Sequence, residues 1–531
     1  MTYNHLDPRI YRLVPVTKET NVSIVSNLSF MNLKVVHGDL IDTPTQAIVV
    51  NLFDGVHRPG GATGAINDAL NGAISSLIDD GEIKGKQGES TLIHTLGKMP
   101  AKRVLIMGLG KQEDFTLGKV RDITADSCRI LRRLGLESAT SIAHGAGIGG
   151  LETSAVAQAM AEGTLLGLYR FDKYLTKSTD QKQVFSDLQI IEQDASKINA
   201  LKAGLEQGRV IAEATILARD MVNEPANVMT PTNIAEIAQQ VAQSNNLEIE
   251  VFSTQRAQEL GMGAFLGVAR GSHQPPQFIA LRYWGDPENP DNNLGLLGKG
   301  ITFDTGGISL KAAASMSEMK TDMSGAAAVI SAMQAIAQLK PTINVTALAP
   351  CTENMPGGDA QRPGDIVRAM NGKSIEVDNT DAEGRLALAD ALGYAHNLNL
   401  KRLVDIATLT GAIVTSLGNL CSGGFTNNQE LMDQVVQSGE QTGERIWQLP
   451  MFDEYKDLNH SEVADIKNTG GRGAGSITAA HFLREFTEDT PWVHLDIAGT
   501  AFSSRVKGHI VKGATGVPVR TLVNLTLELA K

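Results

Sequence analysis

Short aliphatic segments alternate with stretches of helical periodicity along most of this 531-residue chain. Residues 46–50 and 103–110 have the composition of strands. Residues 120–135 and 153–170 instead repeat their apolar positions with helical spacing. From about residue 247 the alternation resumes, and strand segments such as "LGLLGKG" are continuous apolar runs, which are typical of a sheet buried on both faces. The pattern predicts an α/β fold with mostly parallel sheets.

The chain is longer than one typical hydrophobic core requires, which predicts two domains. A polar stretch precedes a long helical pattern, and the prolines of "NEPANVMTPTN" end that pattern. Thr232 or Asn233 is expected to cap the helix that follows. We therefore expect three parts in chain order: a smaller N-terminal α/β domain over residues 1–195, a connecting helix over 196–222 and a larger C-terminal α/β domain over 223–531.

Charge and cysteine content narrow the range of partners. The 47 basic and 59 acidic residues give a formal net charge of -12, so the surface repels phosphate backbones and nucleic acid is a poor candidate partner. Cys128, Cys351 and Cys421 are widely spaced, which suits a reducing compartment. Charged residues interrupt any signal-peptide core in the first thirty positions, and no long aliphatic segment suggests a membrane span. We expect a soluble, cytoplasmic protein that does not bind membranes.

Ionisable side chains collect where the predicted strands of the C-terminal domain end, and open α/β sheets bind ligands at such positions. Four carboxylates and two lysines occupy them: Asp304, Asp322, Asp381, Glu383, Lys299 and Lys311. Crowded carboxylates repel one another unless a cation neutralises them, so a multivalent metal is expected. No histidine occurs between His273 and His396. Oxygen ligands must therefore predominate, which favours Mn²⁺, Mg²⁺ or an oxygen-rich Zn²⁺ site.

Each of these signals also has an ordinary structural interpretation. Asp322 is placed to cap a helix that starts near residue 324, and Asp381 and Arg385 have the spacing of an i,i+4 ion pair. The glycines of "FDTGG" suit a tight turn. Residues 53–68 resemble a phosphate-cradling loop before a helix, although a structural turn is the favoured interpretation there. Periodicity alone does not decide between a metal cluster and scattered surface charge.

Several longer segments resemble one known family in their order and content. "NTDAEGRL" is similar to the signature of the leucyl (cytosol) aminopeptidase family, and "LGKGITFDTGG" resembles another of its motifs. The similarity continues through "MKTDMSGAAAV", "ENMPGGDAQRPGD", "DIATLTGA" and "LDIAGTA". It covers most of residues 220–531 and implies a dinuclear metallopeptidase that releases N-terminal amino acids from peptides.

The resemblance implies a role for each clustered residue. Two divalent ions, Mn or Zn, would be held by Lys299, Asp304, Asp322, Asp381 and Glu383, of which Asp304 and Glu383 bridge. Lys311 falls on the family's electrophilic lysine, and Arg385 on the arginine that holds bicarbonate as the general base. Two adjacent ions acidify a bridging water, whose hydroxide attacks the scissile carbonyl, and they bind the free α-amine of the substrate. Lys299 would ligate as a neutral amine, whereas Lys311 stays protonated.

Substrate preference and assembly follow from the same resemblance. Six residues align with the substrate-binding region of the family: Met319, Asn379, Thr408, Leu409, Gly411 and Ala498. A methionine and small residues suit apolar N-terminal side chains such as Leu or Met. In relatives the N-terminal domain is macro-like and the catalytic domains assemble into a homohexamer, so both are expected here. The resemblance does not place residues 1–31.

Three other functions fit parts of the sequence. The acidic cluster alone suits a dinuclear hydrolase of phosphate esters or amides, although Lys299 as a nitrogen ligand argues against it. Some bacterial relatives bind DNA, but the net charge of -12 argues against that role. The third is an inactive hexameric scaffold, against which the intact Lys311, Arg385 and metal ligands argue.

Overall fold

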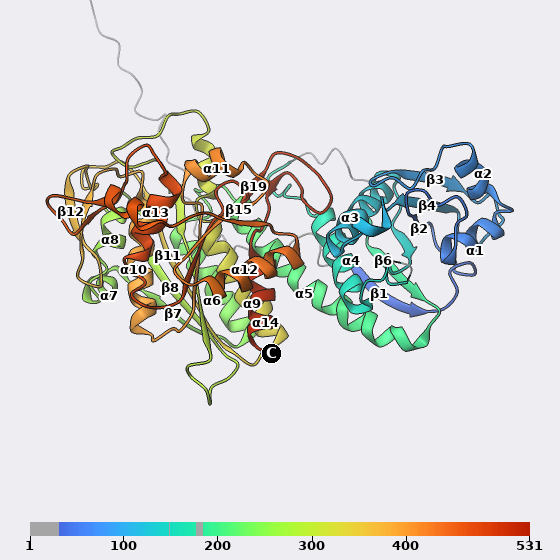
Figure 1. The fold of residues 1–531 in the computed structure, drawn as a ribbon, viewed down its shortest axis with the longest axis horizontal. Coiled ribbons are helices and arrows are strands. Elements are labelled where there is room, and N and C mark those ends of the chain that lie inside the picture. Colours follow the sequence, from blue (N-terminus) through green and yellow to red (C-terminus); the bar gives the residue numbers. More distant parts are fainter. Residues whose placement is uncertain (1–30, 148, 177–183) are drawn as a thin grey trace, which may run out of the picture.

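The chain forms two α/β domains joined by one long helix (Figure 1). The expected two-domain α/β architecture is therefore confirmed. This computed structural model describes residues 31–147, 149–176 and 184–531. The N-terminal stretch before residue 31 and part of the polar stretch before the connecting helix lie outside the described residues.

The smaller domain is built on a sheet that has six strands in the described residues, in the spatial order β1-β6-β5-β2-β4-β3. All neighbouring strands of this sheet are parallel except β3 and β4, which form an antiparallel pair at one edge. The strands span β1 (Asn32–His37), β2 (Ile48–Leu52), β3 (Ser90–His94), β4 (Arg103–Gly108), β5 (Ser138–Ser141) and β6 (Asp187–Glu192).

Helices cover both faces of this sheet, because side chains along a strand point alternately to its two sides. Val49 in β2 packs in the core beneath α3 and α4, whereas Ile48 and Val50 pack in the core beneath α1 and α2. The helices of the domain span α1 (Gly61–Ala69), α2 (Ala73–Asp79), α3 (Leu117–Arg133) and α4 (Thr153–Leu168), with a 3₁₀ turn η1 (Gln112–Asp114).

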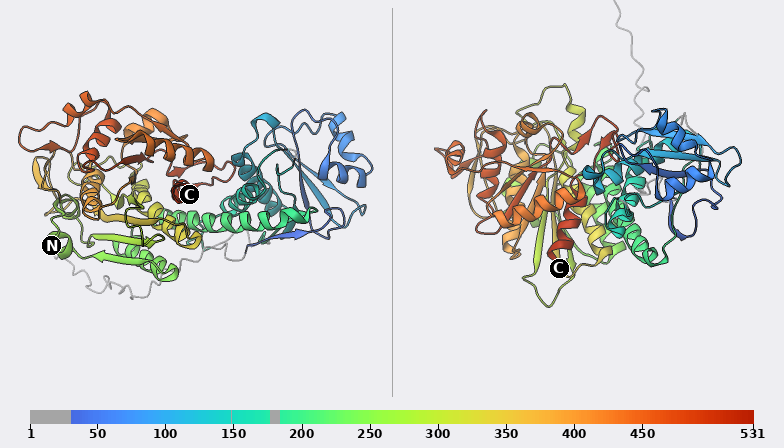
Figure 2. Two further views of the ribbon diagram at one scale, coloured as in Figure 1. Left: turned by 60° about the horizontal axis from the view of Figure 1, so that its bottom comes forward. Right: turned by 45° about the vertical axis from the view of Figure 1, so that its right-hand side comes forward.

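A long helix, α5 (Ile198–Asn223), follows the short turn η2 (Ala195–Lys197) and runs from the smaller domain into the larger one (Figure 2). The buried Arg219 fixes its C-terminal half to both domains. The guanidinium donates from Nη1 to Leu166 O and from Nε to Thr515 O, both at 2.9 Å. The helix thus belongs to the cores of both domains.

The larger domain contains a sheet of nine strands in the described residues, in the order β16-β15-β18-β14-β9-β11-β8-β7, with β10 paired to β11. The central strands β18, β14, β9 and β11 are parallel. The strands span β7 (Glu248–Phe252), β8 (Gln277–Trp284), β9 (Asn293–Gly298), β10 (Gly300–Asp304), β11 (Asn344–Asn354), β14 (Leu403–Ala407), β15 (Ser422–Thr426), β16 (Ile446–Gln448) and β18 (Trp492–Asp496). Two small sheets contain β12 (Asp365–Arg368), β13 (Ser374–Val377) and β17 (Ile466–Lys467), and β19 (Phe502–Ser503) and β20 (Gly513–Ala514).

Helices also sandwich this larger sheet. Leu296 in β9 packs in the core beneath α6, α9 and α14, and its neighbour Leu297 packs in the opposite core beneath α8 and α10. The helices span α6 (Pro231–Asn245), α7 (Thr254–Glu259), α8 (Gly263–Ala269), α9 (Ser324–Leu339), α10 (Glu383–Asn397), α11 (Gly411–Leu417), α12 (Gln429–Thr442), α13 (Gly475–Arg484) and α14 (Val519–Leu529), with η3 (Met316–Thr321) and η4 (Asp453–Asn459).

The cap of α6 differs from the sequence-based expectation. Thr230, rather than Thr232 or Asn233, is the N-cap, and its hydroxyl accepts the backbone N–H of Asn233. Pro231 occupies the first helical position, where a missing N–H costs no hydrogen bond. The expectation was wrong because it took the second proline as a break before the helix rather than as its first residue.

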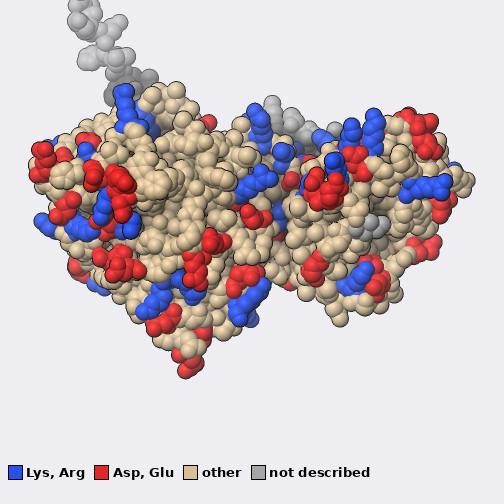
Figure 3. All heavy atoms as spheres, in the orientation of Figure 1, with Lys and Arg blue, Asp and Glu red and all other residues tan. Residues whose placement is uncertain are grey.

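None of the helices in the described part of the chain combines the length and apolar character needed to cross a bilayer. On the face drawn in Figure 3, acidic and basic side chains are interspersed over both domains.

Candidate metal centre

The predicted metal ligands come together at one edge of the larger sheet. Lys299 lies between β9 and β10, and Asp304 is the last residue of β10. Asp322 lies between η3 and α9, whereas Asp381 and Glu383 lie at the start of α10. Parallel strands end at a common edge, so elements that are remote in the sequence deliver their side chains to one place.

Three carboxylates form the centre of the cluster. Oxygen atoms of Asp304, Asp381 and Glu383 lie within 4.8 Å of one another. Asp304 and Glu383 are buried, and Asp381 is half-buried. Burial raises the pKa of Asp304 and of Asp381, because the charged carboxylate loses its hydration.

Lys299 lies against this cluster. Its Nζ is 2.8 Å from Asp322 Oδ1, 2.8 Å from Glu383 Oε1 and 3.0 Å from the carbonyl oxygen of Thr408. Burial alone would lower the pKa of Lys299, but the neighbouring carboxylates raise it overall. A Cβ at Gly384 would come within 2.6 Å of the Lys299 amine, so glycine in the first turn of α10 makes room for this side chain.

Lys311 also contacts the cluster, from the loop after β10. Its Nζ is 2.8 Å from Asp304 Oδ2 and 2.5 Å from Asp381 Oδ1. Burial acts to lower the pKa of Lys311, but the attraction of Asp304 outweighs it and raises the pKa above the usual lysine value. Gly306 has a φ of 85° in this loop, and a Cβ there would lie 2.7 Å from Asp381 Oδ1. The "FDTGG" glycines therefore serve a turn and also let Asp381 approach.

Arg385 is buried in the first turn of α10 and does not pair with Asp381 in the described contacts. Its Nη1 donates to the carbonyl oxygen of Asn468 at 2.6 Å, and its Nε has no hydrogen-bond partner among the described residues. Burial lowers the pKa of Arg385 to about 10. The i,i+4 ion-pair interpretation is wrong, because Asp381 precedes the helix and turns toward Lys311 instead.

The donor set fits divalent cations. Asp322 Oδ2 is buried and has no hydrogen-bond partner among the described residues, although an anionic oxygen is costly to bury alone. The remaining donors are carboxylate oxygens and one amine, as hard divalent metals prefer. Asp322 does not cap α9 with its side chain, since its Oδ1 accepts the hydroxyl of Thr408 at 2.8 Å. The capping interpretation of Asp322 is therefore wrong.

Two asparagines that the sequence reasoning missed hold the cluster in shape. Asn354 donates from Nδ2 to Asp304 Oδ1 at 2.8 Å and also lies 3.5 Å from Glu383 Oε2. Asn468 donates to the carbonyl oxygen of Asn379 at 2.7 Å and presents its own carbonyl to Arg385. Asn354 is the last residue of β11, so the strand-end rule that identified the acidic residues would also have found it.

The six predicted substrate-binding residues lie on segments next to the cluster. Thr408 contacts both Lys299 and Asp322, and the carbonyl oxygen of Met319 accepts the N–H of Asp322 at 3.3 Å. Asn379 accepts the N–H of Asp381 at 2.9 Å. The other three are Leu409, Gly411 and Ala498, which follow the carboxyl ends of β14 and β18.

The buried Asp496 connects two of these predicted substrate-binding residues, Leu409 and Ala498. Its Oδ1 accepts the backbone N–H of Leu409 at 3.1 Å and that of Ala498 at 3.2 Å. Its Oδ2 accepts the hydroxyl of Thr410 at 2.6 Å. Asp496 therefore fixes the spacing between the two strand ends, a role that the sequence reasoning did not identify.

Sequence comparisons place this site in a known family. The cytosol aminopeptidase family is matched by its catalytic domain over residues 216–523 and by its N-terminal domain over residues 49–178. A probable cytosol aminopeptidase of Alkaliphilus metalliredigens is 43% identical over 502 residues, which are 94% of this chain and 100% of the relative. A probable cytosol aminopeptidase of Solibacter usitatus is 46% identical over 94% of this chain and 99% of the relative.

Solved structures agree with the sequence comparisons. A mutant of tomato leucine aminopeptidase superposes with a TM-score of 0.84 at 30% identity, covering 95% of this chain and 98% of that chain. The bottromycin maturation enzyme BotP in complex with Mn superposes with a TM-score of 0.80 at 33% identity, covering 92% of this chain and 100% of that chain. Since both domains and nearly the whole length are matched, the chain belongs to the cytosol aminopeptidase family of metal-dependent aminopeptidases.

Proposed function

We propose that this aminopeptidase uses two divalent cations, Mn²⁺ or Zn²⁺, held by Lys299, Asp304, Asp322, Asp381 and Glu383. The observation that carries the proposal is the approach of Asp304, Asp381 and Glu383 to within 4.8 Å of one another beside the buried, unpartnered Asp322 Oδ2. The Mn in the BotP structure supports manganese as one of the metals. When bound, the ions would supply a polarised water and Lewis-acid activation of the scissile carbonyl.

Lys311 has the charge and position of an electrophile. Its ammonium lies at the edge of the carboxylate cluster, where 24% of the side chain remains exposed, so it can meet a substrate carbonyl. The raised pKa keeps it protonated at neutral pH. A donor in this position stabilises the negative charge that develops on the carbonyl oxygen.

Arg385 is proposed to hold a bicarbonate ion that acts as the general base. Its Nε is a buried donor without a partner among the described residues, and an anion would satisfy it. The backbone carbonyl of Asn468 accepts from Nη1 and holds the guanidinium in place, so the direction of the Nε–H donor is fixed before an anion binds. An anion on Arg385 would accept the proton that the attacking water releases.

The substrates are peptides, and we propose a preference for Leu, Met and other apolar N-terminal residues. The supporting observation is that Met319 and Thr408 both contact Asp322, while Asp496 holds Ala498 close to Leu409. A flexible methionine and small neighbours fit an apolar side chain of variable shape. Asn379, Leu409 and Gly411 would complete this wall.

We further propose a homohexamer in the cytoplasm and a chain divided into residues 1–195, 196–222 and 223–531. Large apolar side chains remain exposed on the catalytic domain, among them Leu420 at 69%, Trp447 at 66% and Phe452 at 63%. Exposed apolar residues of this size favour subunit contacts. The naming of relatives as cytosol aminopeptidases supports the location. Light scattering of the purified chain measures the assembly directly.

Hydrolysis of leucine p-nitroanilide tests the proposed centre. The chain is stripped with chelator and then given Mn²⁺ or Zn²⁺, with N-acetyl-leucine p-nitroanilide as the substrate control. We expect activity to disappear with the metal, to return on addition, and to require the free amine. Bound metal measured by mass spectrometry should approach two ions per chain.

A matched pair of variants distinguishes the loss of a metal ligand from the general effect of removing a negative charge. Asp304→Asn removes a carboxylate inside the cluster, and Asp114→Asn removes one from an exposed turn of the other domain. We expect Asp304→Asn to lose metal and activity, while Asp114→Asn keeps both. Full metal binding and activity in Asp304→Asn would contradict the assigned ligand set.

A further inference from the structure

The hydroxyl of Thr380 joins two loops of the proposed metal centre. Thr380 directly precedes Asp381 in the chain, and its side chain is fully buried. Its Oγ1 donates to the carbonyl oxygen of Gly306 at 2.6 Å and accepts the backbone N–H of Ser309 at 2.8 Å. Since Gly306 and Ser309 lie between β10 and Lys311, the hydroxyl ties the lysine loop to the loop before α10.

The hydroxyl of Ser309 returns the contact. Its Oγ accepts the backbone N–H of Thr380 at 3.2 Å, so each hydroxyl binds the backbone of the other residue. A hydroxyl donates one hydrogen bond while it accepts others, and Thr380 uses both capacities. These three bonds, which we call the hydroxyl clasp, fix two loops whose paired residues are 71 positions apart in sequence.

Gly307 allows the two loops to approach so closely. Its φ is 65°, in the left-handed region that favours glycine. A Cβ at this position would lie 3.1 Å from Thr380 Oγ1 and 2.8 Å from Asn354 Oδ1. A larger residue would therefore press against the clasp.

Lys311 lies at the end of the clasped loop. Its backbone N–H donates to the carbonyl oxygen of Thr305 at 2.9 Å, and its ammonium contacts Asp304 and Asp381. Residues 312–315 on its other flank are exposed and give it little packing support. The position of Lys311 therefore depends on the loop that precedes it.

We propose that Thr380 is a positioning residue for the aminopeptidase reaction, because its clasp with Ser309 sets where the Lys311 ammonium meets the substrate carbonyl. The inference rests on the proposed role of Lys311 as the electrophile. Such a donor stabilises the developing charge only where it is correctly placed, and a displacement of about 1 Å can cost about 100-fold in rate. Thr380 acts through Lys311 and does not itself touch the substrate.

Steady-state hydrolysis of leucine p-nitroanilide by the metal-loaded full chain tests the proposal. Thr380→Val removes the hydroxyl and keeps the β-branched shape of the side chain. We expect kcat to fall about 10- to 100-fold while KM and bound metal stay at the parent values, since a misplaced Lys311 leaves the metal ligands intact. Thr380→Ser, which keeps the hydroxyl, should restore most of the parent kcat.

A double-mutant cycle with Lys311→Ala shows whether Thr380 acts through the lysine. Addition of Thr380→Val to Lys311→Ala should change kcat by less than about twofold, because the group that the clasp positions is already absent. Ser309→Ala removes the other hydroxyl of the clasp from a half-buried position. It should lower kcat in the parent chain and add little in Lys311→Ala, and it replaces Thr380→Val if that variant folds poorly.

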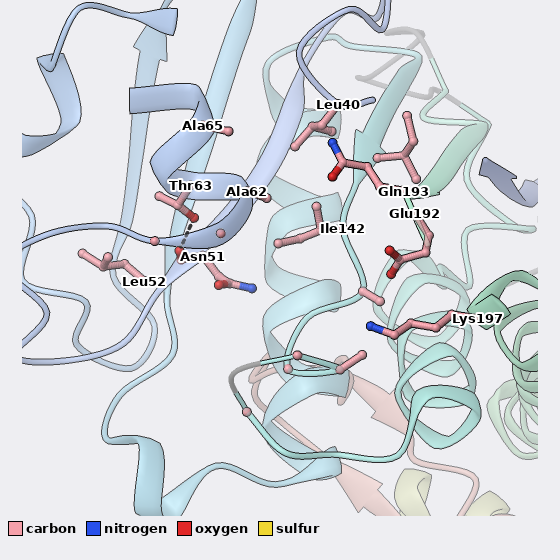
Figure 4. Close-up of a pocket in the computed structure, with 18 of the residues that line it drawn as sticks. Leu40, Asn51, Leu52, Ala62, Thr63, Ala65, Ile142, Glu192, Gln193 and Lys197 are labelled. Carbon is pink, nitrogen blue, oxygen red and sulfur yellow. Dashed lines mark hydrogen bonds between the residues drawn. The ribbon is translucent and has the colours of Figure 1, made fainter. Parts of the chain in front are cut away.

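Thr63→Val in the smaller domain is the matched control. Thr63 is also a buried threonine whose hydroxyl donates to a backbone carbonyl, that of Asn51 at 2.7 Å (Figure 4). Because Thr63 lies in the other domain, its substitution should leave kcat unchanged with or without Lys311.

Three results would overturn the inference and leave the proposed role of Lys311 intact. They are parent-like kcat in both Thr380→Val and Ser309→Ala, equal losses of kcat with and without Lys311, and loss of metal from Thr380→Val. The last would mean that the hydroxyl supports Asp381 as a ligand instead. Parent-like kcat in Lys311→Ala would refute the electrophile itself, and the role of the clasp with it.

Discussion

Asn354 supports the metal centre through a single amide with several acceptors. Its Nδ2 is 2.8 Å from Asp304 Oδ1, 3.0 Å from the carbonyl oxygen of Thr380 and 3.5 Å from Glu383 Oε2. The amide therefore orients two carboxylates, Asp304 and Glu383, that would hold the metal ions. Mutation of a residue that orients a metal ligand typically weakens metal binding about 10- to 100-fold.

We expect Asn354→Ala to bind manganese about 10- to 100-fold more weakly than the parent chain, because the carboxylates of Asp304 and Glu383 lose a fixed direction. Titration of metal-stripped protein with Mn²⁺ measures the change. Asn371→Ala, in the exposed turn between β12 and β13, is the control and should leave the affinity unaltered. Parent-like affinity in Asn354→Ala would show that the carboxylates are oriented without it.

Lys311 is expected to act on the reaction rather than on metal binding. Lys311→Ala should lower kcat by about 100- to 1,000-fold, the usual effect of removing one oxyanion donor, while the bound metal is retained. Lys202→Ala, on the exposed face of α5, is the control for loss of a lysine. Metal content and steady-state kinetics are measured on the same samples. Loss of metal from Lys311→Ala would mean that its ammonium holds Asp304 and Asp381 in place instead.

The acidic residues of the site could be predicted because carboxylates repel one another, and several of them at neighbouring strand ends indicate a bound cation. The position of Asn354 at the end of β11 is the signal that marks it, whereas the chemistry of Asn354 and Asn468 marks neither, since neutral amides occur in turns throughout a chain. Their roles depend on which acceptors lie nearby, and those acceptors come from segments 26 to 89 positions away in sequence. Only the folded arrangement of β11, α10 and the segment after β17 brings them together.

Asp390 joins helix α10 to two neighbouring segments. This fully buried carboxylate accepts the backbone N–H of Phe265 in α8 at 2.8 Å and that of Met370 at 2.7 Å. Burial raises the pKa of Asp390 to about 7, although the two donors act in the opposite direction. Since α10 also carries Glu383 and Arg385, this junction positions the helix of the metal centre.

The raised pKa of Asp390 makes stability depend on pH. Between about pH 4 and pH 7 the folded carboxyl keeps a proton that the unfolded chain releases, so its contribution to the free energy of unfolding falls as pH rises through this window. Asp390→Asn cannot titrate and should lose that pH dependence. Urea unfolding of both proteins from pH 4.5 to 7.5 measures the difference. Identical pH profiles would mean that Asp390 has an ordinary pKa.

The sequence predicted which helices and strands are present more reliably than it predicted where each one begins and ends. The strand segment expected over residues 103–110 contains β4 (Arg103–Gly108), and the helical pattern over residues 153–170 contains α4 (Thr153–Leu168). The start of α6 was misplaced, because Pro231 both breaks a helix and suits its first position. The local sequence does not show whether Pro231 ends one helix or begins the next. In the structure it begins α6, because the hydroxyl of Thr230 caps that helix.

The two domains are fastened together by a buried ionic network. Glu162 in α4 pairs through Oε2 with Arg121 in α3 at 2.6 Å and with Arg520 in α14 at 3.4 Å. Both arginines donate to the carbonyl oxygen of Thr442 at the end of α12, at 3.1 and 2.7 Å. One carboxylate of the smaller domain therefore compensates guanidinium groups from both domains, and so couples their stabilities.

Removal of the Glu162 charge should loosen this coupling. Burial alone would raise the pKa of Glu162, but Arg121 and Arg520 hold it below the usual value, so the stabilisation is present at neutral pH and is lost as pH falls through the lowered pKa. Glu162→Gln leaves the buried Arg121 without its carboxylate partner, whereas Arg520 keeps its ion pair with Glu444. Loss of one partner of a buried ion pair costs about 3 to 5 kcal/mol.

Calorimetry of Glu162→Gln at neutral pH should show a lower unfolding temperature and a separate transition for the smaller domain, because the interface then fails before either core. Glu206→Gln, which removes an exposed carboxylate from α5, should unfold like the parent chain. Below the lowered pKa of Glu162 the parent and Glu162→Gln should converge, since the carboxyl is then neutral in both. A single, unshifted transition in Glu162→Gln would show that α5 alone couples the domains.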